Sequence, residues 1–330
     1  MRRSEMNKFF TVSPLNYIGG KARILDQVLP YFPLHIDHFV DLFCGGCNVG
    51  INTRAQHHVY NDKSSQLIGL LSLFATKDPD SFIQEINHII DKYEFSRTSE
   101  HNFAFYGGNC MKGVSEYNRE KFITLRDEFN SRQEHDDYYY TLLYILIVFG
   151  FNNQMRFNSQ GDYNLPVGKR DFNNVLQNKL KKFMIALQRQ ETTISNFDFR
   201  HFNTDFLTEN SLVYVDPPYL ITGATYNENG GWTKQDEYDL LLFLDGLNDR
   251  GIHFALSNVL RHKGKDNPIL LDWVNDNDYN LNQIQMDYSN SNYQVKGKDS
   301  GTQEVLITNY NNLEEYGRQG FRIYFEPFGL

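Results

Sequence analysis

The chain has 330 residues, a formal net charge of −9 and three cysteines, a length that suits one large α/β domain with an insertion, or two domains. No apolar run approaches the roughly 18 residues that a membrane span needs, and the N-terminus lacks the apolar core of a signal peptide. Three cysteines do not make a disulfide framework, so we expect a cytoplasmic protein without a membrane partner, while the acidic balance argues only weakly against nucleic acid.

The N-terminal part is expected to alternate strands and helices. A strand at 39–43 is followed by a glycine turn and a helix from about Asn48, and a second short strand at 58–60 ends at Asn61 and Asp62. Alternation returns after residue 190, where a helix is expected at 234–248. Strands are predicted there at 193–195, 212–215, 254–257, 281–286 and 305–307. This order indicates an α/β fold with a mainly parallel sheet covered on both faces.

The stretch between these two parts is predicted to be a mostly helical insertion. Its helical patterns cover 65–75, 79–93, 117–130, 138–149 and 173–189. Residues 94–115 are expected to form a loop, and residues 152–168, rich in Asn and Gly, a hairpin or ordered loop. We therefore divide the chain into 1–75 and 191–330, which build the sheet domain, and 76–190, which is inserted.

The stretch DLFCGGCNVG, residues 41–50, places a glycine turn between a strand and a helix start. Such a turn lets a nucleotide approach the backbone, although the match to G-x-G-x-x-G is only partial and NAD is not favoured. Cys44 and Cys47 also form C-x-x-C. Because Cys110 is the only other cysteine, a four-thiolate zinc site is impossible. The two cysteines could still take part in mixed Cys/His metal ligation, form a redox pair or simply be small residues that line the turn, and we favour the last interpretation.

Asp62 follows the second predicted strand. In doubly wound folds an acid at this point accepts hydrogen bonds from ribose hydroxyls. The alternative is that Asp62 caps the helix that begins near Ser64. Together with the glycine turn, Asp62 favours a bound adenosine.

The segment 151–190 is basic within an acidic chain. Seven Lys and Arg residues against Asp162 and Asp171 give it a net charge of +5. The segment is either a solvated helix face or a surface that faces phosphates.

In VYVDPPYL, residues 213–220, a buried strand is predicted to end in an acid, two prolines and a tyrosine. Proline has no N–H and holds the preceding residue extended. The Asp216 carboxylate and the Pro217 carbonyl are then two fixed acceptors beside the ring of Tyr219. This set fits an amino group on a flat heterocycle.

Several segments, in this order, resemble the Dam-type (α-group) DNA adenine-N6 methyltransferases, and among them the modification enzymes of restriction systems. They are LNYIGGKARIL (15–25), FVDLFCGGCNVG (39–50), VYND (59–62), FGFNNQMRFNSQGDYNLPVGK (149–169), FDF (197–199), VYVDPPY (213–219), FALSNV (254–259) and SNYQVKGKDSGTQEVLITNY (291–310).

The resemblance implies a Rossmann-like methyltransferase fold, S-adenosylmethionine as methyl donor, duplex DNA as substrate and a bacterial or phage-encoded source. It further implies that 76–190 is a helical target-recognition domain and that no metal takes part. The implied cofactor contacts are Tyr17, Lys21, Phe43, Cys44, Gly45, Asp62, Asp198, Phe199 and Asp216, and the implied catalytic residues are Asp216, Pro217, Pro218 and Tyr219. Tyr219 would stack on an adenine flipped out of the duplex.

The hairpin at 152–168 is the predicted reader of DNA. The residues that we assign to DNA are Asn152, Asn153, Gln154, Arg156, Asn158, Lys169, Arg170 and Lys181. Arg156 suits guanine, and the three basic residues after the hairpin suit phosphate. Most of the asparagines, Asn164 included, are expected to hold the hairpin together. These side chains differ from those of GATC readers, so GATC is not the expected target.

Three other functions stay open. A DNA-binding protein without activity could lose Asp216, and this chain keeps that residue. An RNA or small-molecule methyltransferase could share the cofactor motifs, but the hairpin argues against it. A cytosine-N4 enzyme usually has serine where Asp216 stands, so an adenine target is preferred. The apolar C-terminal segment YGRQGFRIYFEPFGL raises the expectation of one module of a longer methylase. Further expected partners are a second methylase module or a cognate restriction endonuclease system.

Overall fold

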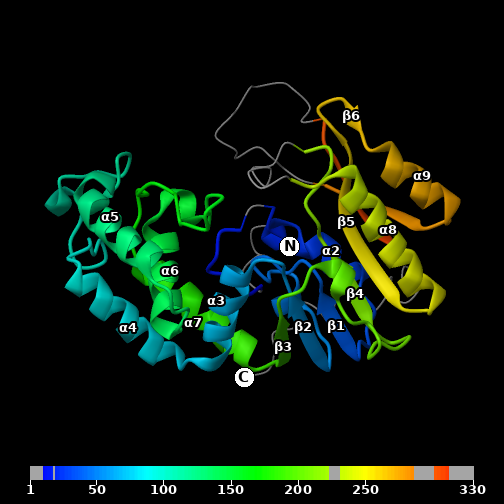
Figure 1. Cartoon of the computed structure of the whole chain (residues 1–330), viewed down its shortest axis with the longest axis horizontal. Coiled ribbons are helices and arrows are strands. Elements are labelled where there is room, and N and C mark those ends of the chain that lie inside the picture. The colour runs from blue at the N-terminus through cyan, green and yellow to red at the C-terminus, as the bar shows by residue number, and fades with distance from the viewer. Residues whose placement is uncertain (1–9, 18, 223–230, 286–300, 312–330) are drawn as a thin grey trace. The chain divides into compact units, whose positions relative to one another are not determined.

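The computed structural model describes residues 10–17, 19–222, 231–285 and 301–311. The chain forms two compact units. The first unit contains residues 21–63 and the described residues from 191 onward, and the second contains residues 11–20 and 64–190. Figure 1 shows the sheet of the first unit and the helices of the second.

The first unit is built on one mixed, mainly parallel sheet, as predicted. Its strands are β1 (His38–Asp41), β2 (His57–Asn61), β3 (Glu191–Ser195), β4 (Leu212–Val215), β5 (His253–His262), β6 (Lys265–Asp266), β7 (Asn280–Ile284) and β8 (Gln303–Thr308). Their order is β3-β2-β1-β4-β5-β8-β7, with β6 paired to β5 outside this path. The first five strands in that order are parallel, and β8 is antiparallel to both of its neighbours.

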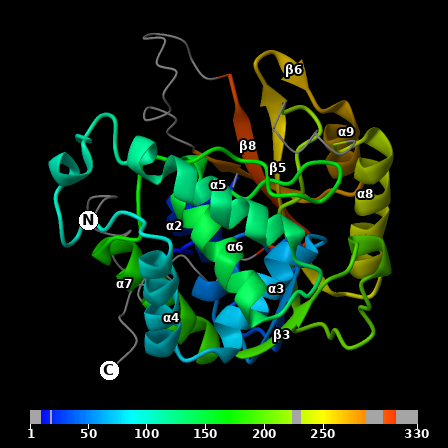
Figure 2. The same ribbon diagram turned by 60° about the vertical axis from the view of Figure 1, so that its left-hand side comes forward.

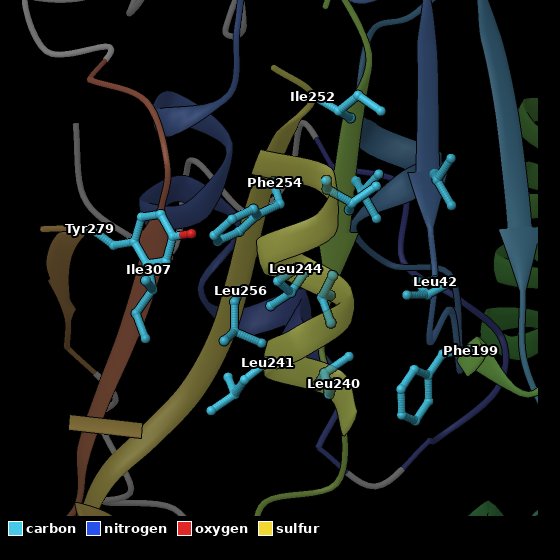
Figure 3. Close-up of a cluster of buried hydrophobic side chains, with 14 of the residues drawn as sticks. Leu42, Phe199, Leu240, Leu241, Leu244, Ile252, Phe254, Leu256, Tyr279 and Ile307 are labelled. Carbon is cyan, nitrogen blue, oxygen red and sulfur yellow. The ribbon is translucent and has the colours of Figure 1, made fainter. Parts of the chain in front are cut away.

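Both faces of this sheet are buried, because successive side chains of each strand point to opposite faces. In β4, Leu212 and Tyr214 join a cluster with α2, whereas Val213 and Val215 join a cluster with α8 and α9. Figure 3 shows part of the second cluster, in which Leu240 and Leu244 of α8 join Phe254 and Leu256 of β5. The helices of this unit are α2 (Leu25–Val28), α8 (Lys234–Asp249), α9 (Pro268–Asp276) and the 3₁₀ turns η1 (Lys21–Arg23), η2 (Leu29–Tyr31), η3 (Gly50–Asn52) and η6 (Phe199–His201).

The second unit is helical. Its elements are α3 (Ser65–Thr76), α4 (Pro79–Lys92), η4 (Phe103–Tyr106), α5 (Ser115–Ser131), α6 (Asp137–Phe149), η5 (Phe151–Asn153) and α7 (Asn174–Gln188). Residues 141–149 of α6 are all buried, and α3 and α5 pack against this helix (Figure 2). Ser64, Asp78, Asp136 and Asn173 each accept a backbone N–H at a helix start, which explains where four of the helices begin.

The expected boundary at residue 75 is corrected. The second unit begins at Ser64, because α3 packs against α6 and α7 of that unit, and residues 11–20 belong to it as well. The expected helix from about Asn48 is also wrong. Only η3 forms there, and the chain turns at Thr53 toward β2. The predicted strand at 281–286 ends at Ile284, and Met286 lies outside the described residues.

Two helices, α2 and α9, were not predicted. Within the hairpin predicted at 152–168, Phe157 and Tyr163 form an antiparallel bridge, and a second bridge joins Val167 to Gly150, two residues before the predicted start. The two ends of this segment are therefore close in space.

The packing of Gly50 gives a stability prediction. A Cβ at this position would lie 2.3 Å from Cε1 of Tyr60, a fully buried side chain. Gly50→Ala should therefore lower the free energy of unfolding by about 1–3 kcal/mol. Gly246→Ala, in the exposed part of α8 with no atom within 4 Å, should raise it by about 0.5–1 kcal/mol. Urea denaturation of both variants checks the pair, and equal shifts would contradict the packing argument.

Candidate active site

The predicted site residues of the first unit gather at the carboxyl edge of the parallel strands. Asp216 follows β4 directly, Asp62 follows β2, and Asp198 lies three residues beyond β3. The glycine turn at Gly45 follows β1, which lies between β2 and β4 in the sheet. Ligands of open α/β sheets bind at this edge, beyond the strand ends.

Four side chains at this edge contact one another, and we call them the carboxylate–lysine cluster: Lys21, Asp216, Tyr219 and Glu304. The Lys21 Nζ atom lies 2.8 Å from Asp216 Oδ1, 2.7 Å from the Tyr219 hydroxyl and 3.7 Å from Glu304 Oε1. The Tyr219 hydroxyl donates to Asp216 Oδ1 at 2.9 Å and lies 3.4 Å from Glu304 Oε1. Lys21 and Glu304 are each only 3% exposed, and Asp216 is 17% exposed.

The electrostatics of this cluster keep Tyr219 as a hydrogen-bond donor. Burial, followed by the charges of Asp216 and Glu304, raises the pKa of the Tyr219 hydroxyl. Burial also raises the pKa of Glu304; the charge of Asp216 adds to this, and Lys21 opposes it. Glu304 was missed at the sequence level, although it lies in a quoted segment, because a single acid inside the apolar strand β8 carries no motif of its own.

The glycine turn after β1 is held by backbone contacts. Gly45 has φ 46° and donates its N–H to Asp62 Oδ2 at 3.1 Å. Asn61 joins the neighbouring segments, since its side-chain amide donates to the carbonyl oxygens of Leu42 and Phe197, both at 3.0 Å. Asp62 is therefore fixed beside the turn, and the alternative role as helix cap is wrong, because Ser64 caps α3.

Cys44 and Cys47 are buried free thiols. Burial raises the pKa of both thiols, and the hydrogen bond with Cys44 only partly opposes this at Cys47. A redox pair needs a stabilised thiolate, so the interpretation as residues lining a turn is favoured. Among the described residues, no three His, Cys, Asp or Glu side chains gather in a set that could ligate a metal.

Three aromatic rings gather beyond β1 and β3. Phe43 lies 5.6 Å from Phe199 and 5.8 Å from Trp232, centroid to centroid, and Phe199 lies 5.9 Å from Trp232. Phe199 is buried in the core, whereas Phe43 and Trp232 are partly exposed. The indole N–H of Trp232 donates to Glu237 Oε2 at 2.6 Å. Trp232 was not predicted, because no motif in the sequence connects residue 232 with the glycine turn.

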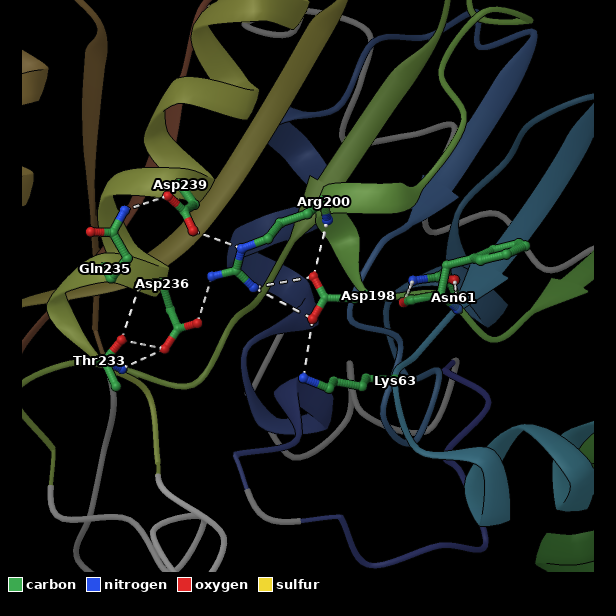
Figure 4. A network of polar contacts seen from close by, with 9 residues as sticks. Asn61, Lys63, Asp198, Arg200, Thr233, Gln235, Asp236 and Asp239 are labelled. Atoms are coloured by element: carbon green, nitrogen blue, oxygen red, sulfur yellow. Dashed lines mark hydrogen bonds and ion pairs between the residues drawn. The ribbon is translucent and has the colours of Figure 1, made fainter.

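Asp198 lies in an ion-pair network at the same edge (Figure 4). Its carboxylate pairs with Lys63 at 3.1 Å and with Arg200 at 3.2 Å, and Arg200 also pairs with Asp236 and Asp239 of α8. Burial acts to raise the pKa of Asp198, but the hydrogen bonds from Arg200 and Lys63 outweigh it and hold the pKa low. A ligand contact of Asp198 would therefore be made by a carboxylate that is already paired.

The predicted DNA-reading residues lie in the second unit, and most of the asparagines hold the hairpin together, as expected. The amide of Asn153 donates to the carbonyl of Val148, in the last turn of α6, at 2.5 Å. Asn158 Oδ1 accepts the backbone N–H of Gln160 and of Asp162. Asn164 Oδ1 accepts a hydrogen bond from the Nε–H group of Arg156, with an N–O distance of 2.8 Å.

Other assigned residues of this unit also have protein partners. The carbonyl oxygen of Asn152 accepts the side-chain amide of Asn16 at 2.7 Å, and that of Gln154 accepts the Tyr163 hydroxyl at 3.0 Å. The carbonyl of Tyr17 accepts the N–H of Gly20. These contacts involve the backbone carbonyl oxygens and not the side chains. The roles assigned to the side chains of Tyr17, Asn152 and Gln154 therefore stay predictions.

The three basic residues assigned to phosphate differ in their surroundings. Lys169 and Arg170 are exposed, and Lys169 donates to the carbonyl of Met111 at 3.1 Å. Lys181 pairs with Asp80 of α4, with N–O distances of 2.5 and 2.7 Å. A phosphate would have to compete with that carboxylate, so Arg170 is the better candidate. No helix within the described ranges is both long and apolar enough to cross a membrane.

The chain is similar in sequence to known DNA methyltransferases. Residues 17–290 match the family described as D12 class N6 adenine-specific DNA methyltransferase. The modification methylase StsI of Streptococcus sanguinis is 38% identical over 93% of this chain and 44% of its own length. The type II methyltransferase M.FokI of Planomicrobium okeanokoites is 40% identical over 91% and 43%. The DNA adenine methylase of Escherichia coli K12 is 24% identical over 74% and 79%. The chain thus spans less than half the length of the first two relatives.

Asp41, at the end of β1, gives a pH prediction. Burial, aided by the charge of Asp216 and opposed by the N–H of Gly50, raises its pKa from 3.8 to about 8. The folded state therefore holds this proton more tightly than the unfolded state, and stability falls as the pH rises between these two values. Asp41→Asn removes the titration. Its melting temperature should match the wild type at pH 4 and exceed it increasingly toward pH 8, and a pH-independent difference would contradict the assignment.

Proposed function

Because the chain belongs to the D12 class N6 adenine-specific DNA methyltransferase family, we propose that it transfers a methyl group from S-adenosylmethionine to N6 of an adenine in duplex DNA. The observation that carries this proposal is the position of Asp216. Its carboxylate stands at the end of β4, is followed by two prolines, and is held by Lys21 and Tyr219 through Oδ1. An acceptor fixed in this way suits an amino group that must be oriented before it reacts.

The neighbouring turns fit the adenosine part of S-adenosylmethionine. Asp62 is a carboxylate beside the Gly45 turn, where ribose hydroxyls are commonly bound. The rings of Phe43 and Trp232 are partly exposed and suit a flat base. When bound, S-adenosylmethionine supplies a methyl group that its sulfonium has already activated for transfer.

The residues of this chain then orient the adenine. Its exocyclic nitrogen is a poor nucleophile, because its lone pair is delocalised into the ring. Asp216 and the Pro217 carbonyl accept the two amino hydrogens, which favours a pyramidal nitrogen and stabilises the charge that develops on it. Pro217 and Pro218 have no N–H groups to compete for these acceptors. Alignment of the reacting atoms contributes about 7–11 kcal/mol in the best model reactions.

The target adenine has to leave the duplex to reach Asp216, and Tyr219 is the proposed stacking partner. The Lys21 Nζ atom lies 2.7 Å from the Tyr219 hydroxyl and 5.1 Å from the centroid of its ring, so the ammonium contacts the hydroxyl end of this side chain. This arrangement makes Tyr219 both a holder of Asp216, through its hydroxyl, and a platform for the base, through its ring.

The same family resemblance supports a place in a restriction–modification system. Two relatives are named modification methylases or type II methyltransferases and are more than twice as long as the matched part. A second methylase module, or a cognate restriction endonuclease, is the corresponding proposed partner of this chain. An adenine target is favoured over cytosine N4 because Asp216 stands where the cytosine enzymes usually have serine.

The central prediction concerns Asp216. Asp216→Ala removes the acceptor and should lower methyl incorporation into duplex DNA by more than 100-fold, a loss on the scale that misplacement of reacting groups produces. Circular dichroism checks that the variant is folded. Incorporation within a factor of ten of the wild type would remove Asp216 from the mechanism.

Specificity is predicted to depend on Arg156. Its guanidinium is partly exposed and held by Asn164, and an arginine fork that reads guanine discriminates by about 1–3 kcal/mol. Arg156→Ala should relax preference at one guanine, whereas Arg170→Ala should weaken all sequences alike and reduce the salt dependence. Competition binding against single-base variants separates the two. An equal loss for every sequence in Arg156→Ala would make it a phosphate contact.

A further inference from the structure

Glu304 is a buried carboxylate that the proposed mechanism does not yet use. It lies in β8, an antiparallel strand that follows none of the turns assigned to the cofactor or to the target base. Its side chain is 3% exposed and faces Lys21 and Tyr219, at 3.7 and 3.4 Å. An isolated carboxylate at such a position is strongly destabilising unless its partners repay the loss of hydration.

The carboxylate–lysine cluster contains one basic group and two acidic groups. One ammonium, that of Lys21, faces the carboxyl groups of Asp216 and Glu304, and the Tyr219 hydroxyl lies within 3.5 Å of both groups. Both short contacts made to Asp216 fall on Oδ1. This leaves Oδ2 as the oxygen that is suited to accept an amino hydrogen from a substrate.

We propose that Glu304 is a positioning residue for methyl transfer: its carboxylate shares the Lys21 ammonium with Asp216 and lies beside the Tyr219 hydroxyl, so that Asp216 keeps Oδ2 directed to the amine. The inference rests on the proposed function and assigns a role to a strand outside the D-P-P-Y turn. Glu304 acts through Lys21 and Tyr219 and needs no contact with the substrate.

A physical consequence distinguishes this role from simple packing. The neutral form of Glu304 attracts Lys21 less than its ionised form, so the geometry of Asp216 should depend on the ionisation of Glu304. The groups that face this pair of carboxylates are Lys21 and Tyr219, together with Asp41 and Tyr214, whose pKa values the charge of Asp216 helps to raise. Because burial raises the pKa of Glu304, its ionisation should appear in the pH dependence of kcat above the ordinary range of a glutamate.

The test is Glu304→Gln in the full chain. This variant keeps the size and removes the charge. With S-adenosylmethionine and a duplex that the wild type methylates, kcat should fall by about 100-fold, the scale of a small misplacement of reacting groups, while KM for both substrates changes little. The acid limb that reflects Glu304 should be absent from the pH profile of the variant.

Two further variants keep the test decisive. Glu304→Asp retains the charge but shortens the side chain, so its kcat should lie between those of the wild type and Glu304→Gln, with the acid limb present. Asp245→Asn removes another carboxylate of the same unit, which holds Trp273 and Tyr279, and should leave kcat and the pH profile unchanged.

The outcomes separate the inference from the proposed function. The role of Glu304 alone is overturned if the wild type methylates adenine while Glu304→Gln has a kcat within twofold of the wild type and an unshifted acid limb in its pH profile. If Glu304→Gln does not fold, a Glu304→Asp variant with wild-type kcat and pH profile overturns it equally. A wild type that methylates no duplex overturns the function from which the inference starts.

Discussion

The carboxyl edge of the sheet, where the candidate site lies, depends on one buried cation. Lys21 is almost completely removed from water, and its ammonium is balanced by Asp216 and Glu304 within 4 Å. Removing one partner of a buried ion pair leaves an uncompensated charge and costs several kcal/mol. These side chains therefore constrain one another, and the position of Asp216 follows from all of its partners rather than from the D-P-P-Y turn alone.

The sheet makes this arrangement possible. Asp216 comes from the end of β4, Glu304 from β8 and Lys21 from the 3₁₀ turn η1. In the strand order, β5 lies between β4 and β8, so residues almost 90 positions apart in sequence reach the same edge. The remaining turns at that edge, at Gly45 and Asp62, are tied to each other by a hydrogen bond. The proposed adenosine subsite and the proposed amine acceptor then lie at the ends of neighbouring strands.

The sequence predicted the mainly parallel sheet and six of the helices, because apolar periodicity and capping residues are local signals. Strand β4, for example, was predicted with its observed bounds from the run Leu212–Val215. The prediction of a helix after the glycine turn was wrong. Whether such a turn continues as a helix depends on the path of the chain to β2, and no local sequence pattern determines that path. Glu304 and Trp232 were missed because they contact side chains that are distant in sequence, and Asp80, the partner of Lys181, could not be identified for the same reason.

The chemical identity of the reaction product tests the proposed function most directly. Isotopically labelled S-adenosylmethionine, the chain and a randomised DNA duplex should give label in the DNA, and nucleoside analysis by mass spectrometry should place it on N6-methyladenine within a limited set of sequences. Label on N4-methylcytosine, or none in the DNA from a folded protein that binds S-adenosylmethionine, would contradict the assignment of Asp216 as the acceptor that orients adenine.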